Sequence, residues 1–401
     1  MDFYGYMRPN GKAGARNYVL LLPVNRSLNF IASNVERMTR NTRHFEIPAE
    51  TGRTEVDREV IARTLIGLMN NANVGGIVLL AVKSGAGSAY KNMCAERFEE
   101  EARKTGKPLR IVYLTNVGGS YNMLGETLRL TREVLLEVSD FRRENCPLSA
   151  LTLGVKCGTS DATSGIAGNP CVGAAFDQLI RAGGTAFFSE TTEIIGAEDL
   201  VAKRAVNESV AKKILSAAKH WEDKAKATGE DIRKINPIPA NIAAGISSLE
   251  EKSLGAIAKS GTSPIQDVLK YAEMPKGSGL YFVDSWMSSL SLPLCLTACG
   301  ATIMLYQMGG GKIAQHPMMP SINPTVVSPF LYLTGNAIAY SRAPDNFDFD
   351  ASPIMTEGAS IPEMGTKLLE HLSAIASGTM TKMETLNYAE QLELYMEGPV
   401  L

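Results

Sequence analysis

The most reactive group of side chains in this sequence lies in residues 155–173, VKCGTSDATSGIAGNPCVG. The stretch combines one amine, two thiols, one carboxylate, several hydroxyl groups and four glycines. Glycines let backbone N–H groups come close to an anion, and the N-terminus of a following helix favours negative charge. We therefore expect a pocket for a carboxylate substrate, with a purely structural loop as the alternative. The candidate residues are Lys156, Cys157, Gly158, Ser160, Asp161, Ser164 and Asn169.

A second stretch, residues 188–199 (FSETTEIIGAED), is rich in carboxylates. Carboxylate oxygens suit hard or borderline divalent ions, and a carboxylate in a closed site can act as a base when its pKa rises. Glu190 and Glu193 are therefore candidate metal ligands or proton carriers. The alternative is that these residues cap and charge the start of a helix, which is the better interpretation for Glu198.

Further polar residues occur later in the chain. Asn241 and Lys252 belong to a third polar group, and a lysine can hold a substrate carboxylate. Asp284 follows an apolar run that is typical of a strand. The glycines at 309–311 match neither a P-loop nor a dinucleotide fingerprint, and His316 is a weaker site candidate.

Two series of alternating strand and helix patterns must position these groups. In the first series, apolar runs at 18–23, 76–82 and 110–114 suit buried strands. Helical patterns occupy residues 28–39, 55–69, 89–105 and 123–138. In the second series, strands are expected at 151–155, 185–189, 280–284 and 302–306, and helices at 174–182, 208–228, 249–260, 290–298 and 362–377.

These patterns predict an α/β protein with two Rossmann-like parallel-sheet blocks covered by helices. The polar stretch 142–147 marks the expected boundary. Residues 1–145 then form an N-terminal α/β domain, and residues 146–401 form a C-terminal α/β domain that carries most of the active site. In parallel sheets the ligand lies at the carboxyl ends of the strands, where the polar stretches fall.

Composition excludes several classes of protein. With 401 residues, 45% hydrophobic residues and 20% charged residues, the chain is an ordinary globular protein of two or three domains. A net charge of −2 gives no basic field for nucleic acid. No signal region and no bilayer-spanning run are present, so we expect a cytoplasmic protein without a membrane partner. Six scattered cysteines form no disulfide framework, and four dispersed histidines make a histidine-built metal site unexpected.

Several long motifs resemble the altronate/galactarate dehydratase family of sugar-acid hydro-lyases. They cover nearly the whole chain, in the expected order. The motifs are GYMRPNGKAGARNY at 5–18, RTLIGL at 63–68, NVGG at 73–76, KCGTSDATSG at 156–165 with Asn169-Pro170, SETTEIIGAE at 189–198 and EKSLGAIAKSG at 251–261.

The resemblance implies a lyase that uses a divalent metal, Fe²⁺ first and Mn²⁺ second, held by Glu190 and Glu193. Fused members of the family begin with a small domain that contains histidines. This chain begins directly at the first motif, so the resemblance implies a separate small subunit, able to supply a histidine ligand, and an oligomer.

The sequence also departs from the dehydratases. Those proteins carry three cysteines at places that read NRS at 25–27, ETGR at 50–53 and KSG at 83–85 in this chain. The ETGR segment at 50–53 and the DSWMSS segment at 284–289 look closer to the branch formed by the large subunit of sulfolactate sulfo-lyase. Arg53 therefore joins the substrate-binding candidates, and the leaving group is either water or sulfite.

The expected reaction is elimination of a β-substituent from a small 2-hydroxy carboxylic acid, which gives a 2-keto acid. Lys156 or Glu190 would remove the α-proton, and the metal would stabilise the enolate-like intermediate. Asp161 is the third catalytic candidate. The missing cysteines motivate the alternative, a non-catalytic binding or regulatory large subunit that has lost its metal site.

Overall fold

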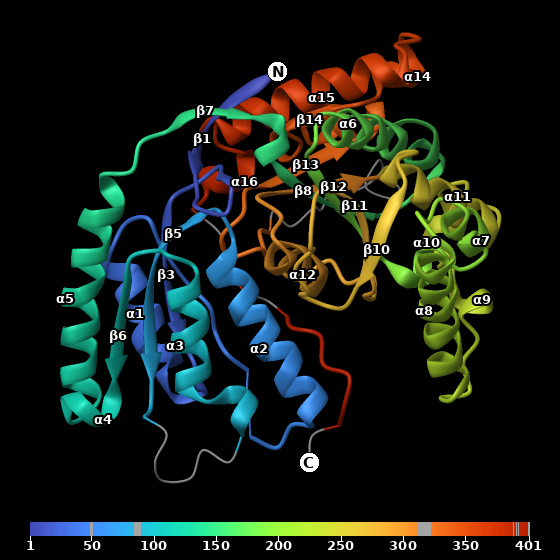
Figure 1. The fold of residues 1–401 in the computed structure, drawn as a ribbon. Helices are drawn as coiled ribbons and strands as arrows, with labels where there is room; N and C mark the ends of the chain where they lie inside the picture. Colours follow the sequence, from blue (N-terminus) through green and yellow to red (C-terminus); the bar gives the residue numbers. More distant parts are fainter. Residues whose placement is uncertain are drawn as a thin grey trace.

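Two parallel sheets, each covered by helices, organise the chain in the computed structural model (Figure 1). The structure describes residues 1–48, 51–83, 90–310, 322–387, 389, 391 and 393–399. The predicted α/β class with two helix-covered parallel blocks is confirmed. Gly311 and His316 lie outside the described residues.

The N-terminal block contains a four-stranded sheet in the order β4-β3-β5-β6, with all pairs parallel. The central strand β5 (Val74–Ala81) is buried along its whole length, which explains its unbroken apolar sequence. The other strands are β3 (Tyr18–Pro23), β4 (Thr42–His44) and β6 (Leu109–Tyr113). The helices are α1 (Asn29–Met38), α2 (Glu55–Asn70), α3 (Ala95–Lys104), α4 (Leu114–Val117) and α5 (Ser120–Ser139).

The C-terminal block contains a seven-stranded parallel sheet in the order β10-β11-β9-β8-β12-β13-β14. Its strands are β8 (Thr152–Gly158), β9 (Thr185–Phe188), β10 (Ile265–Leu269), β11 (Gly279–Val283), β12 (Ile303–Met308), β13 (Phe330–Thr334) and β14 (Phe349–Asp350). The main helices are α6 (Asn169–Arg181), α7 (Glu198–Ala202), α8 (Glu208–Lys226), α11 (Leu249–Ile257), α12 (Ser291–Cys299) and α15 (Ile361–Ala376). Smaller helices are α9 (Ile232–Ile235), α10 (Pro239–Ala243), α13 (Ala337–Arg342), α14 (Pro353–Thr356) and α16 (Lys382–Thr385).

Strand β8 lies where the winding of the large sheet reverses. The chain passes from β8 to β9 on one side and later returns to β12 on the other side. Ligands of open parallel sheets bind outside the carboxyl ends of the strands at such a reversal. The last residues of β8 are Lys156, Cys157 and Gly158, so the topology places them at the favoured position.

Two expected loops are more ordered than the sequence indicated. Residues 142–147 include strand β7 (Glu144–Pro147), which pairs antiparallel with β1 (Asp2–Met7); β1 also pairs with β2 (Ala13–Gly14). The glycines and polar residues of 156–173 favour a long loop, but this expectation is wrong at both ends. Strand β8 runs to Gly158, and a π-helical turn (Ser164–Gly168) leads into α6 at Asn169. The expected boundary at 145/146 falls inside β7 and stays a prediction.

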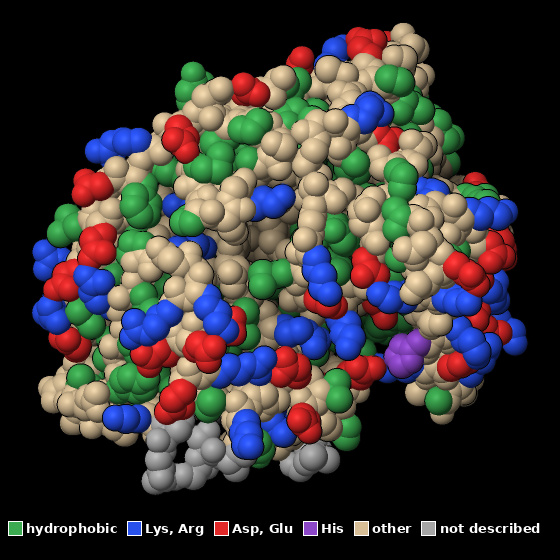
Figure 2. Space-filling model, viewed as in Figure 1, with side chains coloured by type: hydrophobic (Ala, Val, Ile, Leu, Met, Phe, Trp, Pro, Cys, Tyr) green, Lys and Arg blue, Asp and Glu red, His purple; other side chains and the backbone are tan. Residues whose placement is uncertain are grey.

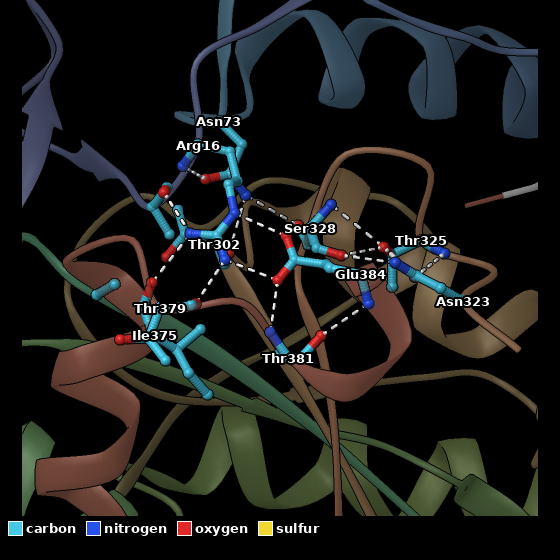
Figure 3. A network of polar contacts seen from close by, with 12 residues as sticks. Arg16, Asn73, Thr302, Asn323, Thr325, Ser328, Ile375, Thr379, Thr381 and Glu384 are labelled. Atoms are coloured by element: carbon cyan, nitrogen blue, oxygen red, sulfur yellow. Dashed lines mark hydrogen bonds and ion pairs between the residues drawn. The ribbon is translucent and has the colours of Figure 1, made fainter. Parts of the chain in front are cut away.

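Polar side chains connect the N-terminal block to the later part of the chain (Figure 3). Arg16 makes a two-pronged ion pair with Glu384, with N···O distances of 2.6 and 2.7 Å. Asn73 donates to the carbonyl oxygen of Thr302 and to Ser328. The last described residues also return to α2, where Asp57 accepts hydrogen bonds from the N–H groups of Glu397 and Gly398. The first 18 residues and the C-terminal segment therefore help to fix the two blocks relative to each other.

We expect Gly67→Ala to destabilise the packing of α2 against α12. A Cβ at Gly67 would lie 2.1 Å from the carbonyl oxygen of Ala298, so the helices would have to separate. Such overpacking costs about 1–3 kcal/mol, measurable by urea denaturation. Gly125→Ala is the matched control, because nothing lies within 4 Å of its Cβ position on α5, and we expect it to stabilise by about 0.5–1 kcal/mol. Equal effects of both changes would contradict this explanation.

Basic and acidic side chains are interspersed on the face that Figure 2 shows. This distribution matches the net charge of −2. Among the described helices, none has the length and apolar character needed to cross a membrane.

Candidate active site

A fully buried carboxylate, Glu190, holds the centre of the candidate site just beyond the end of β9. Its Oε1 lies 3.1 Å from the Lys156 ammonium, and its Oε2 accepts a hydrogen bond from the Cys157 N–H at 3.0 Å. The Lys259 ammonium contacts the same Oε2. The ends of β8 and β9 are therefore joined through one side chain.

A second carboxylate, Glu193, extends this arrangement. The Cys157 thiol donates to its Oε2 at 3.3 Å, and Lys252 lies 3.3 Å from its Oε1. Lys259 lies 3.9 Å from Glu193 and 3.2 Å from the Cys157 sulfur. We call these six residues the buried cluster: Lys156, Cys157, Glu190, Glu193, Lys252 and Lys259.

Burial and the charges of the buried cluster shift the pKa values of four of its members. Burial by itself would raise the pKa of Glu190, but Lys156 and Lys259 outweigh it and hold this pKa below the ordinary value. Burial would lower the pKa of both lysines, but the neighbouring anionic groups, Glu190 above all for Lys156, outweigh it and raise the pKa values. Burial, followed by the two carboxylates, raises the pKa of the Cys157 thiol. At neutral pH Lys156, Lys259 and Glu190 are therefore charged, and the Cys157 thiol is neutral.

Glu190 occupies an unusual backbone conformation. Its φ of 75° and ψ of 64° lie in the left-handed region, which costs a non-glycine residue about 1–2 kcal/mol. The following turn holds it there, because Thr191 N–H donates to Ser285 O at 2.9 Å and Glu193 N–H donates to Glu190 O at 2.8 Å. This backbone conformation turns the carboxylate back towards β8, where it contacts Cys157. Strained conformations of this kind are frequent at active sites.

A pocket of about 290 Å³ lies beside the buried cluster and shares Lys252 with it. Most of its remaining lining comes from the turn after β8 and from α11. Four further residues expected from the sequence line it: Ser160, Asp161, Ser164 and Asn169. The Asn169 Nδ2 donates to Gly255 O at 2.8 Å, whereas its buried Oδ1 has no hydrogen-bond partner among the described residues. An acceptor left open in a pocket suits a hydroxyl group of a ligand.

Asp161 binds neighbouring loops together. Its Oδ1 accepts hydrogen bonds from Thr163 and Ser164, while its Oδ2 accepts from the N–H of Gly310 and from Asn336. Gly310 follows β12 and Asn336 follows β13, so one carboxylate connects three strand ends. These contacts favour a positioning role over the catalytic role expected from the sequence.

We expect Asp161→Asn to raise KM more than it lowers kcat. The new amide would place an N–H donor against other donors, and an unmet buried hydrogen bond costs about 1–3 kcal/mol. Steady-state kinetics and urea denaturation would show both effects. Asp199→Asn, at an exposed position on α7, is the control. Unchanged KM and unchanged stability would contradict a positioning role.

Other candidates lie in different surroundings. Gly158 packs against Tyr306, whose hydroxyl would be 2.5 Å from a Cβ, so this glycine makes room for a neighbour. The Asn241 Nδ2 donates a hydrogen bond to Ser160 O, and its Oδ1 accepts one from the Ile238 N–H. Asp284 accepts hydrogen bonds from Thr191 and Trp221 and lines a different pocket.

Arg53 lies in the N-terminal block, where its carbonyl oxygen accepts a hydrogen bond from Arg58. No contact described for it reaches the buried cluster. Its substrate-binding role therefore stays a prediction.

Sequence reasoning missed Lys259. This lysine lies on a 3₁₀ turn (Ala258–Ser260) directly after α11 and is 1% exposed. The available signal was the motif at 251–261, which contains it. Asn236, which accepts from Lys252 at 2.7 Å, was missed as well.

Three donors in the buried cluster are close enough to hold a metal ion. Ligand atoms of Cys157, Glu190 and Glu193 lie within 4.8 Å of one another. However, both oxygens of Glu190 are already paired with ammonium groups, and three lysines face two carboxylates. A divalent ion would have to displace Lys156 and Lys259 while the Cys157 thiol is protonated. The present arrangement therefore does not fit a divalent ion, and we derive no step through one.

Buried ion pairs beside a pocket, at the winding reversal of a parallel sheet, are typical of a ligand site in an α/β protein. Sequence profiles identify the family. The profile of D-galactarate/altronate dehydratase, C-terminal, matches residues 148–399, and that of D-galactarate dehydratase/altronate hydrolase, second domain, matches residues 5–139. The chain belongs to the D-galactarate/altronate dehydratase family, as the resemblance indicated.

Individual relatives show the same relationship. The chain is 32% identical over 394 residues to (2R)-sulfolactate sulfo-lyase subunit beta of Chromohalobacter salexigens, covering 97% of this chain and 96% of the relative. It is 29% identical over 409 residues to altronate dehydratase of Bacillus subtilis, covering 100% of this chain and 78% of that protein. It is 29% identical over 426 residues to galactarate dehydratase (L-threo-forming) of Escherichia coli, covering 99% of this chain and 77% of that protein. All three relatives are named as lyases or dehydratases.

Proposed function

We propose that this chain is the large subunit of a lyase that eliminates a β-substituent from a small 2-hydroxy carboxylic acid and yields a 2-keto acid. One observation carries the proposal: the buried Glu190 carboxylate is held between two lysine ammonium groups at the winding reversal of the sheet. The names of the relatives support the same reaction class.

In the proposed mechanism, substrate binding activates the base. With both ammonium groups paired to it, Glu190 is too weak a base to remove a proton from carbon. A substrate carboxylate entering from the pocket competes for Lys156 and Lys259, and Lys252 at the pocket wall guides it inward. Once its partners turn to the substrate, burial raises the pKa of Glu190.

Glu190 then removes the proton from C2, and the lysines stabilise the negative charge that develops on the substrate carboxylate. The electron pair of the C2–H bond forms the C2–C3 double bond, and the C3–X bond breaks with its electrons leaving on X. Lys156 donates a proton when X leaves as hydroxide, whereas sulfite leaves as an anion. The resulting enol takes a proton at C3, loses the proton of its C2 hydroxyl group and becomes the 2-keto acid.

The leaving group is proposed to be sulfite, with water as the second candidate. The relative with 32% identity is named a sulfo-lyase, and the three cysteine positions of the dehydratases read differently here. That relative is also named subunit beta, which supports a separate small subunit in this enzyme. Because the carboxylates of the buried cluster are already paired with lysines, Fe²⁺ or Mn²⁺ would need a ligand from outside this chain, such as a histidine of that subunit, and metal analysis of the complex tests this proposal.

A substrate screen of the co-expressed two-subunit complex tests the proposal. Sulfolactate, altronate and galactarate would be incubated with the enzyme anaerobically, with and without added Fe²⁺. We expect 2-keto acid in step with sulfite from sulfolactate. Keto acid without sulfite, from a sugar acid, would assign the reaction to dehydration. No product from any 2-hydroxy acid would overturn the lyase and favour a non-catalytic subunit.

A further inference from the structure

A second pocket, of about 730 Å³, lies at the opposite edge of the N-terminal sheet from the carboxyl ends of its strands. It is bounded by the first residue of β3, the residue before β4, the end of α5 and the C-terminal segment near α16. The motif at 5–18 contributes Tyr6, Arg16, Asn17 and Tyr18 to its walls. The proposed reaction makes no use of these residues.

The walls of this pocket carry a strong excess of positive charge. Four arginines line it, and the one carboxylate among the lining residues is Glu384. Arg143 donates to three carbonyl oxygens, those of Tyr4, Ala376 and Ala15, each at 2.8 Å. Burial lowers the pKa of this guanidinium, as expected for a charge that neutral partners do not compensate.

The arginines differ in what they can offer to a ligand. Arg16 uses its N–H groups on Glu384 and on three carbonyl oxygens, so it contributes fixed charge and no free donor (Figure 3). Arg43 has a buried Nε without an acceptor in the described part of the chain, while its Nη1 lies 3.6 Å from Glu36 Oε1 and its Nη2 donates to Asn387 Oδ1 at 3.3 Å. Arg142 is exposed at the rim and bonds only to carbonyl oxygens of its own turn.

Aromatic rings hold two of these guanidinium groups in place. Arg43 lies over the Tyr18 ring at 4.7 Å, and Arg143 lies over the Tyr6 ring at 4.6 Å. A guanidinium stacked in this way presents its N–H edge in a fixed plane, which suits oxygen atoms of phosphate or carboxylate groups. The pocket is therefore organised before any ligand arrives.

We propose that this pocket binds a small multivalent anion that carries phosphate or carboxylate groups. Four arginines against Glu384 and Glu36, which pairs with Arg43, leave an excess of two positive charges, and this excess favours a ligand with more than one negative charge. The volume falls in the range of small-molecule sites, roughly 300–1,000 Å³. The anion contacts Arg43 on β4 and Arg142 after α5, and it also faces Asn387 on the C-terminal segment. It thus connects the N-terminal block to that segment and stabilises the folded chain.

Calorimetric titration of the whole chain with inorganic pyrophosphate and, separately, with citrate tests this proposal. We expect saturable binding that weakens as salt is added, with a matching rise in the midpoint of thermal unfolding. Tighter binding of pyrophosphate assigns the site to phosphorylated ligands, and tighter binding of citrate assigns it to polycarboxylates. Arg43→Gln and Arg142→Gln should each weaken binding by about tenfold, the loss of one charge-assisted contact.

Arg129→Gln, on the exposed face of α5, is the control and should bind like the unchanged chain. Glu190→Gln should also retain binding, because this site is independent of the buried cluster. If neither anion binds more tightly than about 1 mM, or if the Arg43→Gln/Arg142→Gln double variant binds as well as the unchanged chain, the proposal is wrong.

Discussion

Glu190→Gln is expected to lower kcat by about 10²- to 10⁴-fold, the usual contribution of a general base. The amide keeps the size of the side chain but cannot accept a proton from the substrate. It also leaves two buried ammonium groups without their shared anion, and removing one partner of a buried pair costs about 3–5 kcal/mol. Product assays would measure the first effect, and urea denaturation would measure the second.

The control for this prediction lies in the same segment. Glu198 is half-buried at the start of α7, where its carboxylate accepts a hydrogen bond from Gly196 N–H. Glu198→Gln should retain nearly full activity, as expected for a residue at a helix start. Circular dichroism would show whether each variant is folded. A folded Glu190→Gln enzyme with unchanged turnover would refute the role of this carboxylate.

Lys259→Met is expected to be nearly as damaging to activity. The substitution removes one of the two ammonium groups that hold Glu190 and that would stabilise the charge on the substrate. We expect a fall in kcat/KM of about 10²- to 10³-fold, similar to the loss of one electrostatic stabiliser in other enzymes. Lys213→Met is the control, because Lys213 is half-exposed and its pair with Asp267 on the surface contributes about 0–1 kcal/mol.

Lys259→Met should also change how stability depends on pH. The pKa of Glu190 is below its ordinary value in the fold, so its ion pairs stabilise the protein above the unfolded pKa of about 4.3. That contribution is lost as the pH falls through the folded pKa. Without Lys259 the folded pKa rises, so the loss begins at higher pH. Unfolding curves between acid and neutral pH would show no difference between the two proteins if Lys259 did not hold Glu190.

The sequence predicted the inner strands of both sheets because parallel strands buried on both faces require unbroken apolar runs, but it missed the outer strands β4, β10, β13 and β14. The runs at 18–23 and 76–82 correspond to β3 and β5. Strands β1 and β7 were not predicted, because they form a small antiparallel sheet of mixed burial without an apolar run. The ordered turn after β8 was missed because its glycines are also typical of loops.

The site was predicted in part for a similar reason. Polar residues at the end of β8 and just after β9 meet because neighbouring parallel strands end at one edge. This rule brought Lys156 and Glu190 together but said nothing about Lys259, which is 69 residues from Glu190 and reaches it from a turn rather than a strand end. The same rule included Asp284, but that side chain turns to Trp221 on α8.

The fate of the C2 proton gives the most direct test of the account. Substrate labelled with deuterium at C2 would be converted by the two-subunit enzyme and followed by NMR. We predict slower turnover than with unlabelled substrate, and release of the C2 deuterium to water in step with keto-acid formation, with both signals absent from Glu190→Gln. Keto acid formed at an unchanged rate, with the label transferred completely to C3, would contradict proton removal by the buried cluster.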